Sequence, residues 1–413
     1  MSENKMTMKQ TQTKLFDFSD AGLDFCAGSK NLFPDRFKKM LALGYNEQTV
    51  SSAAVSSDQV TLTYGGAHGY KADRVLKVNG GTLSSINGGE FWIDSVTTNT
   101  VTFTLDNAPF SITGGFTTRI ASLGWSLEYE NANVHVYKCK KLDESDLYVR
   151  LCFQNVATNR NAISPCLGDS YNPLTGFITD ANTYLSNAEI LSPIHTALTW
   201  EYQRQPHADF NNATYDQGKA RFGKAVVCGS LYHFVSLHNT TDDDYCRRVC
   251  AILPAQTNYY DQSAVLLGEI SNMSMSAYAP TLMIPVSAAY VKNVRVIFTN
   301  IFNNVSMIEE VNREQQAMSS FVPASIDTFN TTTCELIPLY IASNGQHIGY
   351  ITSGMYRAKY SESNTPPIAF SASPSFTSDI DLSSIIAIHS VSRAPGLGAT
   401  VFFAVPIEEV KYA

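Results

Sequence analysis

The sequence predicts a mainly β protein: a short N-terminal helix, a small antiparallel β sandwich or barrel, and then a large irregular β-rich domain. Short segments rich in β-branched and aromatic residues recur along the chain, with Asn-Gly, Gly-Gly and Pro/Ser stretches between them. The clearest helical spacing of apolar residues lies near the N-terminus. The 413 residues are enough for two or three domains, which we expect at residues 1–48, 49–123 and 124–413.

Residues 1–48 are expected to form a polar arm and a short helix. The first stretch, of about thirty residues, is polar, and we expect a mobile arm that becomes ordered only when it reaches a neighbouring molecule. Apolar side chains then follow at helical spacing: Phe33, Phe37, Met40 and Leu41. Pro34 suits the first turn of a helix and Gly44 suits its C-terminal end. The pattern indicates a short amphipathic helix docked on whatever part of the fold follows it.

Residues 49–123 are expected to form the small β domain. The stretch VNGGTLSSINGGEFWI (78–93) contains two Asn-Gly-Gly triplets, and glycine supplies the positive φ angles of tight hairpin turns. We expect two chain reversals here, with Phe91 and Ile93 on one face of the next strand and Trp92 on the other. The TTNT sequence at 97–100 is expected to turn the next hairpin. A glycine-rich phosphate-binding loop is disfavoured, because no helix follows and no lysine is suitably placed. The predicted strand segments are 59–66, 74–81, 89–96, 100–105 and 116–123.

The remaining residues, 124–413, contain no obvious linker and are expected to form one irregular β-rich domain. The segment KAVVCGSLYHFVSLHN (224–239) is predicted to contain a strand with four residues on one face: Leu231, His233, Val235 and Leu237. Residues 291–302 and 399–410 are equally strand-like. Residues 303–321 are expected to be helical or irregular, and 361–379 have the Pro/Ser punctuation of a long loop.

Composition and charge exclude several classes of protein. The formal net charge is −8 and no block of Lys or Arg occurs, so the basic footprint of a nucleic-acid-binding protein is absent from the sequence. The sequence has no apolar run of about 18 residues and no apolar signal-peptide region at its start, so we expect no membrane span and folding in a cytosol. Charged residues are only 16%, and Ser, Thr and Asn take their place. Such a surface suits a protein packed against others.

The eight cysteines are expected to be buried free thiols, as is usual in a cytosolic chain. The relative positions of Cys139 and Cys152 can be inferred from the strand register of an expected hairpin. If residues 143–146 form the loop of a hairpin, Leu142 lies opposite Leu147, Cys139 faces Arg150, and Cys152 is a diagonal neighbour on the same face. Diagonal neighbours are roughly 7–8 Å apart, too far for a disulfide. We therefore predict that Cys139 and Cys152 are not bonded.

The segment HNTTDDDYCRRVC (238–250) contains residue types that can bind metal ions. Zinc could use His238, Cys246 and Cys250, but a fourth ligand and the usual tighter cysteine pair are missing. Asp242, Asp243 and Asp244 lack the spaced oxygen ligands of a calcium loop. We therefore predict no metal site, and a solvated acidic loop followed by a strand.

Catalytic patterns are weak. Gly168-Asp169-Ser170 is similar to the nucleophile block of one hydrolase class, but no partner histidine is placed to activate the serine, and a turn before Pro173 explains the same residues. The acidic residues of 199–216 could supply a glycosidase pair: Glu201, Asp209 and Asp216. His233 is expected to be a hydrogen-bonded core residue. We predict no catalytic residue and no cofactor.

The order of segments carries a resemblance. The helix leads to the Asn-Gly-Gly unit, which ends in SVTTNTVTFTL (95–105). A Gly124-Trp125 junction, KAVVCGSLYHFVSL, and LIPLYIASNGQHIGYITSGMY (336–356) follow. Over nearly its whole length the chain resembles a family of virion structural proteins of tailed bacteriophages and prophages. The resemblance implies a non-enzymatic part of a phage particle, in the tail or baseplate region, assembled in the host cytoplasm.

The sequence is therefore compatible with three functions. The first is a structural virion protein that binds copies of itself and other virion proteins. The second is a receptor- or glycan-binding protein at the tail tip or collar, in which Tyr259-Tyr260 and Phe91-Trp92 stack on sugars; a neck or capsid decoration protein is a related possibility. The third is a depolymerase that uses Glu201 and Asp216 in a groove. The first is our prediction, with no nucleic-acid or membrane partner.

Overall fold

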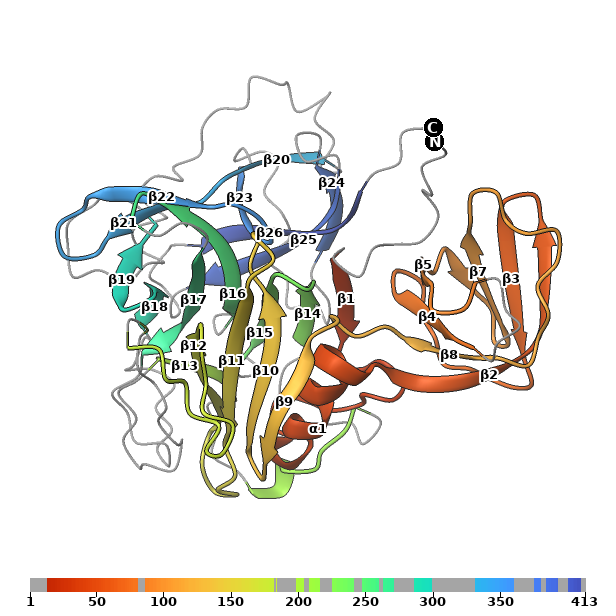
Figure 1. The fold of residues 1–413 in the computed structure, drawn as a ribbon, viewed down its shortest axis with the longest axis horizontal. Helices are drawn as coiled ribbons and strands as arrows, with labels where there is room; N and C mark the ends of the chain where they lie inside the picture. Colours follow the sequence, from red (N-terminus) through yellow and green to blue (C-terminus); the bar gives the residue numbers. More distant parts are fainter. Residues whose placement is uncertain are drawn as a thin grey trace.

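The computed structural model is mainly β, with 53% of residues in strands and 7% in helices, which confirms the predicted fold class. It describes residues 13–80, 86–181, 183, 198–203, 208–215, 225–240, 247–259, 263–270, 286–298, 331–359, 375–379, 384–392 and 400–409. Figure 1 shows one large β-rich body and a small barrel that stands beside it.

The predicted mobile arm is wrong from Lys14 onward; residues 1–12 lie outside the described part of the chain. Strand β1 (Lys14–Asp17) pairs antiparallel with β14 (Ala225–Gly229), and all four of its residues are buried. The physical reason is the KLFDF alternation. Leu15 faces one hydrophobic cluster while Phe16 faces another, so both sides of the strand are covered.

The predicted N-terminal helix is confirmed. A 3₁₀ turn (Lys30–Leu32) leads into α1 (Phe33–Lys38), and a π-helical turn (Lys39–Leu43) follows. All four predicted apolar side chains are buried. Gly44 has φ 76° and donates its backbone N–H to the Lys39 carbonyl at 2.8 Å. It ends the helix as expected, since glycine takes positive φ without a steric penalty.

The small domain is a closed barrel, which decides between the two predicted architectures. Its strands run in the order β5-β4-β8-β2-β3-β7-β6, and every pairing is antiparallel. The two end strands, β5 and β6, are separated in the chain by only Ile93 and Asp94, and the Asp94 N–H bonds the Thr102 carbonyl at 3.0 Å. The sheet therefore closes on itself (Figure 1). Its strands are β2 (Tyr45–Ser56), β3 (Gln59–Tyr64), β4 (Val75–Asn79), β5 (Glu90–Trp92), β6 (Ser95–Val96), β7 (Thr100–Thr104) and β8 (Thr117–Ile120).

The two Asn-Gly-Gly triplets do not form two reversals. Both flank one connection between the antiparallel pair β4 and β5, in which residues 81–85 are not described. The Asn87 side chain accepts the Gly80 N–H at 2.6 Å, so the two triplets close the same loop. The TTNT turn is confirmed, because the Thr97 N–H bonds the Thr100 carbonyl at 2.9 Å.

The large body is built on one extensive sheet. Fourteen strands run in the order β1-β14-β15-β16-β22-β21-β19-β18-β17-β13-β12-β11-β10-β9, and β16 also pairs with β17. That extra pairing closes β16, β22, β21, β19, β18 and β17 into an antiparallel ring. The strands not yet defined are β9 (Ser126–Asn131), β10 (Val134–Lys140), β11 (Asp146–Phe153), β12 (Asn161–Gly168), β13 (Leu198–Gln203), β15 (Phe234–Asn239), β16 (Arg247–Thr257), β17 (Ser263–Ile270), β18 (Val286–Val291), β19 (Val294–Ile297), β21 (Pro338–Ile341) and β22 (His347–Ile351).

A further closed barrel completes the body, with strand order β20-β23-β26-β25-β24 and one parallel pairing between β20 and β24. Its strands are β20 (Thr331–Glu335), β23 (Tyr356–Lys359), β24 (Ser375–Asp379), β25 (Ser384–Ser392) and β26 (Thr400–Glu409). The prediction of a strand over 399–410 is confirmed for the described residues by β26. Within 291–302, Val291 ends β18 and Val294–Ile297 form β19, but Lys292 and Asn293 form the turn between them. The loop prediction for 361–379 is wrong for its last five residues, which form β24; residues 303–321 lie outside the described part.

The strand predicted within residues 224–239 is β15, where Val235 and Leu237 share a face, but Leu231 and His233 precede it in the turn of a hairpin formed by β14 and β15. β14 and β15 pair from Gly229 and Phe234 outward, and the Ser230 N–H bonds the His233 carbonyl at 2.9 Å. A Cβ on Gly229 would lie 2.6 Å from that same carbonyl oxygen. Only glycine allows the two strand ends to approach so closely.

The hairpin of β10 and β11 has a different register from the predicted one. Cys139 pairs with Leu147, and Cys152 pairs with Val134. The turn spans Lys141–Ser145, with Glu144 at φ 66°. Cys139 was predicted to face Arg150 but faces Leu147, so the observed register differs from the predicted one by an odd number of residues. An odd shift moves residues to the opposite face. Cys139 therefore faces the main core while Cys152 lies on the other side, and both are free thiols, as predicted.

Candidate functional site

The outer face of the small barrel carries an array of uncharged, mostly small side chains. In β3 and β7, every second residue is apolar and faces the barrel interior, where Phe91 and Phe103 stack at 4.4 Å. The residues between them point outward. We call this surface the hydroxyl face; it consists of Ser52, Ala54 and Ser56 of β2, Gln59, Thr61 and Thr63 of β3, Thr100, Thr102 and Thr104 of β7, and Ser95 of β6.

The strand register aligns these residues in rows. The central row is Ala54, Thr61, Thr102 and Ser95, each opposite the next across neighbouring strands. The hydroxyl groups of Thr61 and Thr102 are 3.1 Å apart and hydrogen-bonded. Asp94 lies at the edge of the face, where its carboxylate accepts a hydrogen bond from the Thr104 hydroxyl at 2.7 Å. The face itself has hydroxyl donors and acceptors and no formal charge.

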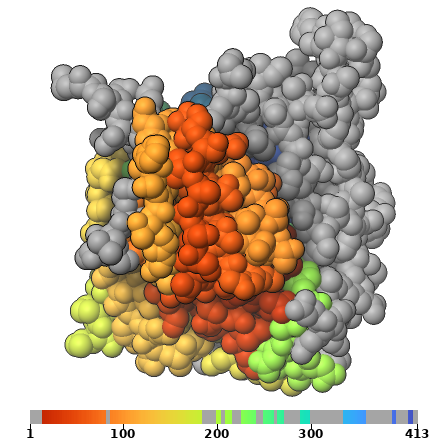
Figure 2. All heavy atoms as spheres, turned by 90° about the vertical axis from the view of Figure 1, so that its right-hand side faces the viewer, coloured from red at the N-terminus to blue at the C-terminus, as the bar shows by residue number. Residues whose placement is uncertain are grey.

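The small barrel stands away from the large sheet, and β3 lies on its far side (Figure 1). Figure 2 looks onto this side of the molecule, where residues of the small barrel form the surface nearest the viewer. The loop after β7 adds a fully exposed aromatic ring, Phe110, with a relative exposure of 101%. This loop begins at Leu105, whose N–H bonds the Asp58 carbonyl in the β2–β3 turn, and returns to β2 through the Gly115 N–H and the Val50 carbonyl.

Buried ion pairs hold the barrel against the N-terminal segment. Asp20 accepts two hydrogen bonds from Arg74, the residue before β4, at 2.7 and 3.0 Å, and one from the Tyr45 hydroxyl at 2.9 Å. Lys14 of β1 contacts Glu90 of β5 at 2.7 Å, and both side chains are almost completely buried. Since β1 is itself paired with β14 in the large sheet, these contacts tie the barrel to the body.

The pKa values follow from this arrangement. Burial opposes ionisation of Asp20, but the attraction and hydrogen bonds of Arg74, with Lys71, outweigh it, so the pKa of Asp20 lies below its ordinary value. Burial lowers the pKa of Lys14 despite the opposing effect of Glu90. The half-buried Trp92 of β5 packs against the hydrophobic cluster of the large body. The barrel is therefore held by both desolvated charge and apolar contact.

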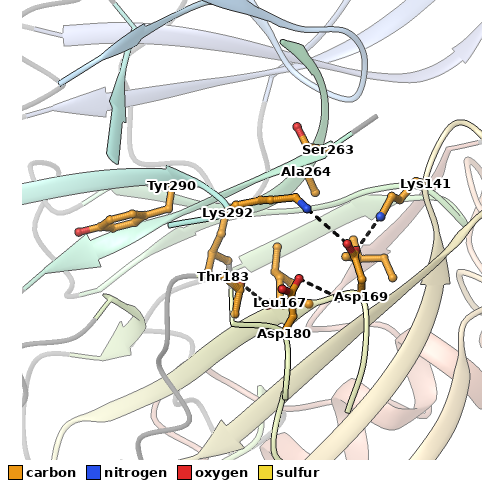
Figure 3. Close-up of a pocket in the computed structure, with 12 residues that line it drawn as sticks. Lys141, Leu167, Asp169, Asp180, Thr183, Ser263, Ala264, Tyr290 and Lys292 are labelled. Atoms are coloured by element: carbon orange, nitrogen blue, oxygen red, sulfur yellow. Dashed lines mark hydrogen bonds and ion pairs between the residues drawn. The ribbon is translucent and has the colours of Figure 1, made fainter. Parts of the chain in front are cut away.

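A small pocket lies between strands β11 and β12 on one side and strands β17 and β18 of the six-stranded ring on the other (Figure 3). Lys141 from the β10–β11 turn and Lys292 from the β18–β19 turn both point at the Asp169 carboxylate, at 2.6 and 3.4 Å (Figure 3). The cavity volume is about 30 Å³, which holds only a few water molecules. A Cβ on Gly168 would overlap the side chain of Ile178, so glycine is required there. Asp169 of the Gly168-Asp169-Ser170 sequence thus connects the β10–β11 turn to the β18–β19 turn through its two ion pairs. The Ser170 hydroxyl is hydrogen-bonded to the Thr179 hydroxyl at 2.9 Å.

The residues of 238–250 that could have bound a metal ion are only partly described. His238 is fully buried, donates from Nε2 to the Glu201 carbonyl at 2.9 Å and stacks on Tyr202. Cys250 is a buried free thiol, and Cys246 and residues 242–244 lie outside the described part. Among the residues that the structure describes, no group of three or more His, Cys, Asp and Glu side chains is placed to hold a metal ion.

The carboxylates of the depolymerase alternative do not face a groove at Glu201. Its side chain is 2% exposed and forms an ion pair with the buried Arg160. Asp209 lies in a 3₁₀ turn (Ala208–Phe210), and Asp216 is outside the described residues. His233 is a buried, hydrogen-bonded residue as predicted, since its Nδ1 lies 2.8 Å from the Ser230 hydroxyl.

The aromatic residues considered for sugar stacking do not form a platform. Phe91 is 2% exposed in the barrel interior, and Trp92 is occupied by its contact with the large body. Tyr259 is exposed, whereas Tyr260 lies outside the described residues.

Sequence reasoning missed the buried ion pairs and the hydroxyl face. A signal for the first was available: Lys14, Arg74 and Glu90 each stand inside or beside a short apolar strand segment, where an unpaired charge would be costly. The hydroxyl face had a signal too, in the Thr residues that alternate with apolar residues in β3 and β7. Which strands become neighbours could not be read from the alternation.

No helix in the described ranges has the length and apolar character needed to cross a membrane. Searches against protein-family models, curated proteins and solved structures found no match to this chain.

Proposed function

We propose that this chain is a structural component of a tailed bacteriophage virion, in the tail or baseplate region, which acts through protein–protein contacts and performs no catalytic step. Its partners are copies of itself and other virion proteins, and it is assembled into the particle in the host cytoplasm. Neither nucleic acid nor a membrane is among the partners. The order of sequence segments and the Ser/Thr/Asn-rich composition support this proposal.

The observation that favours this function most is the way the hydroxyl face is presented. The barrel that carries it is held to the body by Asp20–Arg74 and Lys14–Glu90, both buried. A surface whose position is fixed before binding loses less conformational freedom on association. Its side chains are short, so few rotamers are immobilised in a contact. These are properties of a docking surface repeated over many copies, where avidity supplies the stability of the assembly.

The test is the location of the chain in particles. An antibody against the purified chain is used to probe density-gradient fractions of phage particles, with immunogold electron microscopy to locate it. We expect the chain to sediment with infectious particles after a high-salt wash, with label at the tail or baseplate. Recovery of the chain only in the unassembled soluble fraction would refute the proposal. Label on the capsid or neck would retain a virion role and correct the position.

A further inference from the structure

We propose that the hydroxyl face of the small barrel docks on the same face of a second copy of this chain, related by a two-fold axis. This inference deepens the proposed function and rests on it only for its biological setting, because the contact itself can be measured on the purified chain. The surface is the one defined above, over β2, β3, β7 and β6.

The chemistry of the face makes it complementary to itself. A hydroxyl group is both a donor and an acceptor of hydrogen bonds, so each Thr or Ser can pair with a hydroxyl of the opposing copy. A face of carboxylates or ammonium groups could not meet its own copy in this way. A two-fold contact places the same patch on both sides and therefore requires this self-complementarity.

The charge of the chain favours the same site. Its formal net charge is −8, so two copies repel each other at long range. The hydroxyl face carries no carboxylate, and Asp94, at its edge, already accepts a hydrogen bond from Thr104. Contact through this face brings few like charges together. It also desolvates only neutral groups, which costs much less than burying ions.

The size of the face determines the strength that is expected. Three strands about 4.8 Å apart, β2, β3 and β7, with three outward residues about 6.8 Å apart along each, span on the order of 300 Å², and Ser95 of β6 adds one residue at the edge. A standard stable interface buries about 800 Å² per partner, so the contact between two isolated copies is weak. Phe110 is fully exposed on the loop between β7 and β8, which is fastened to β2 at Val50, and it supplies an aromatic ring of the kind that anchors interfaces.

Sedimentation equilibrium of the full-length chain tests the proposal. The wild-type chain is expected to dimerise reversibly with a Kd in the range of about 10 μM to 1 mM. Thr102 is central in the face, between Thr61 and Ser95. Thr102→Glu and Thr102→Lys are each expected to weaken dimerisation at least about tenfold, because near the two-fold axis each charge meets its own copy. An equimolar mixture of the two variants is expected to dimerise at least as tightly as wild type.

Two comparisons make the result specific. Thr175→Glu adds the same charge at an exposed site on the large body and is expected to leave dimerisation unchanged. Phe110→Ser is expected to weaken it without adding charge. Circular dichroism and thermal unfolding of each variant establish that it is folded; if Thr102→Glu fails this check, Thr61→Glu and Thr61→Lys replace the pair at the neighbouring central position.

The outcomes separate this inference from the proposed function. A wild-type chain that remains monomeric at about 1 mM, or Thr102 variants that dimerise like wild type, would overturn the docking proposal, whether or not the chain is found in virions. Failure of the Glu and Lys variants to pair with each other would show that the face binds a different surface, which also overturns it. Dimerisation as predicted, by a chain absent from particles, would uphold the surface and reject the virion role.

Discussion

Replacing Arg74 by methionine is expected to destabilise the protein by about 3 kcal/mol, because it leaves the Asp20 carboxylate buried without its main partner. Removal of one member of a buried pair typically costs about 3–5 kcal/mol. The lower end applies here because Asp20 keeps three other contacts, from the Tyr45 hydroxyl at 2.9 Å, the Asp17 backbone N–H at 3.1 Å and Lys71 at 3.2 Å. The Arg74 and Asp20 side chains are 8% and 6% exposed, so solvent does not replace the lost interaction.

Urea unfolding at pH 7, followed by tryptophan fluorescence and circular dichroism, measures this cost. Trp92 packs against the large body and reports on the contact between it and the small barrel. Lys140→Met is the matched control, since Lys140 contacts Asp146 at 2.6 Å with both side chains about one-third exposed. That variant is expected to lose less than about 1 kcal/mol.

The double variant Asp20→Asn/Arg74→Met is expected to recover at least about 1 kcal/mol relative to Arg74→Met, because the uncompensated charge is gone. The sign of the pH dependence follows from the pKa of Asp20, which lies below its ordinary value in the folded protein. Its contribution to wild-type stability is present above about pH 4 and is lost as the pH falls through the folded pKa. In Arg74→Met, burial raises the pKa of Asp20, so the carboxyl is protonated earlier and the gap to wild type narrows in acid. A loss below about 1 kcal/mol at pH 7, or a gap that widens toward pH 4, would refute this reasoning.

Three further predictions concern other parts of the fold. Burial lowers the pKa of three histidines to about 4, so between about pH 6.5 and 4 the unfolded state binds more protons than the folded state. The free energy of unfolding therefore decreases as the pH is lowered, and urea titrations should show a loss of about 3–5 kcal/mol from pH 7 to pH 5. A profile that stays flat over this range would contradict the prediction. The three histidines are His135, His233 and His238. Gly44→Ala should lower the unfolding free energy by at least about 1 kcal/mol more than Gly88→Ala, because both have similar positive φ but only a Cβ at Gly44 would overlap the Ile120 carbonyl oxygen; equal losses would show that the backbone relieves the overlap. The six cysteines that are buried in the described part of the chain should not react with a thiol reagent in the native protein, and burial raises the pKa of the Cys228 thiol to about 12. Mass spectrometry of labelled peptides checks this, and rapid labelling of any of these six would contradict the structure.

Local patterns in the sequence are sufficient to predict those features of the structure that depend only on residues close together in the chain. The helix at residues 33–38 follows from apolar spacing and from Gly44, and the inward and outward faces of β3 and β7 follow from strict alternation. The same alternation placed Phe91 and Ile93 in the core and Trp92 on the other side of the strand. Each of these depends on the geometry of one segment, which a few residues determine.

Tertiary structure decided everything that depends on which segments meet. β1 is ordered because β14 and two hydrophobic clusters cover it, and nothing in the polar residues before it indicates that partner. The small domain is a barrel because Asp94 joins β5 and β6 against β7, a contact that also aligns the rows of the hydroxyl face. Asp20 and Arg74 are 54 residues apart in the chain and form a buried pair only once the barrel has closed. The sequence by itself determined secondary structure and the sidedness of strands, whereas registers, ion pairs and the surface for partners required long-range packing, because their energies arise between residues that only the complete fold brings together.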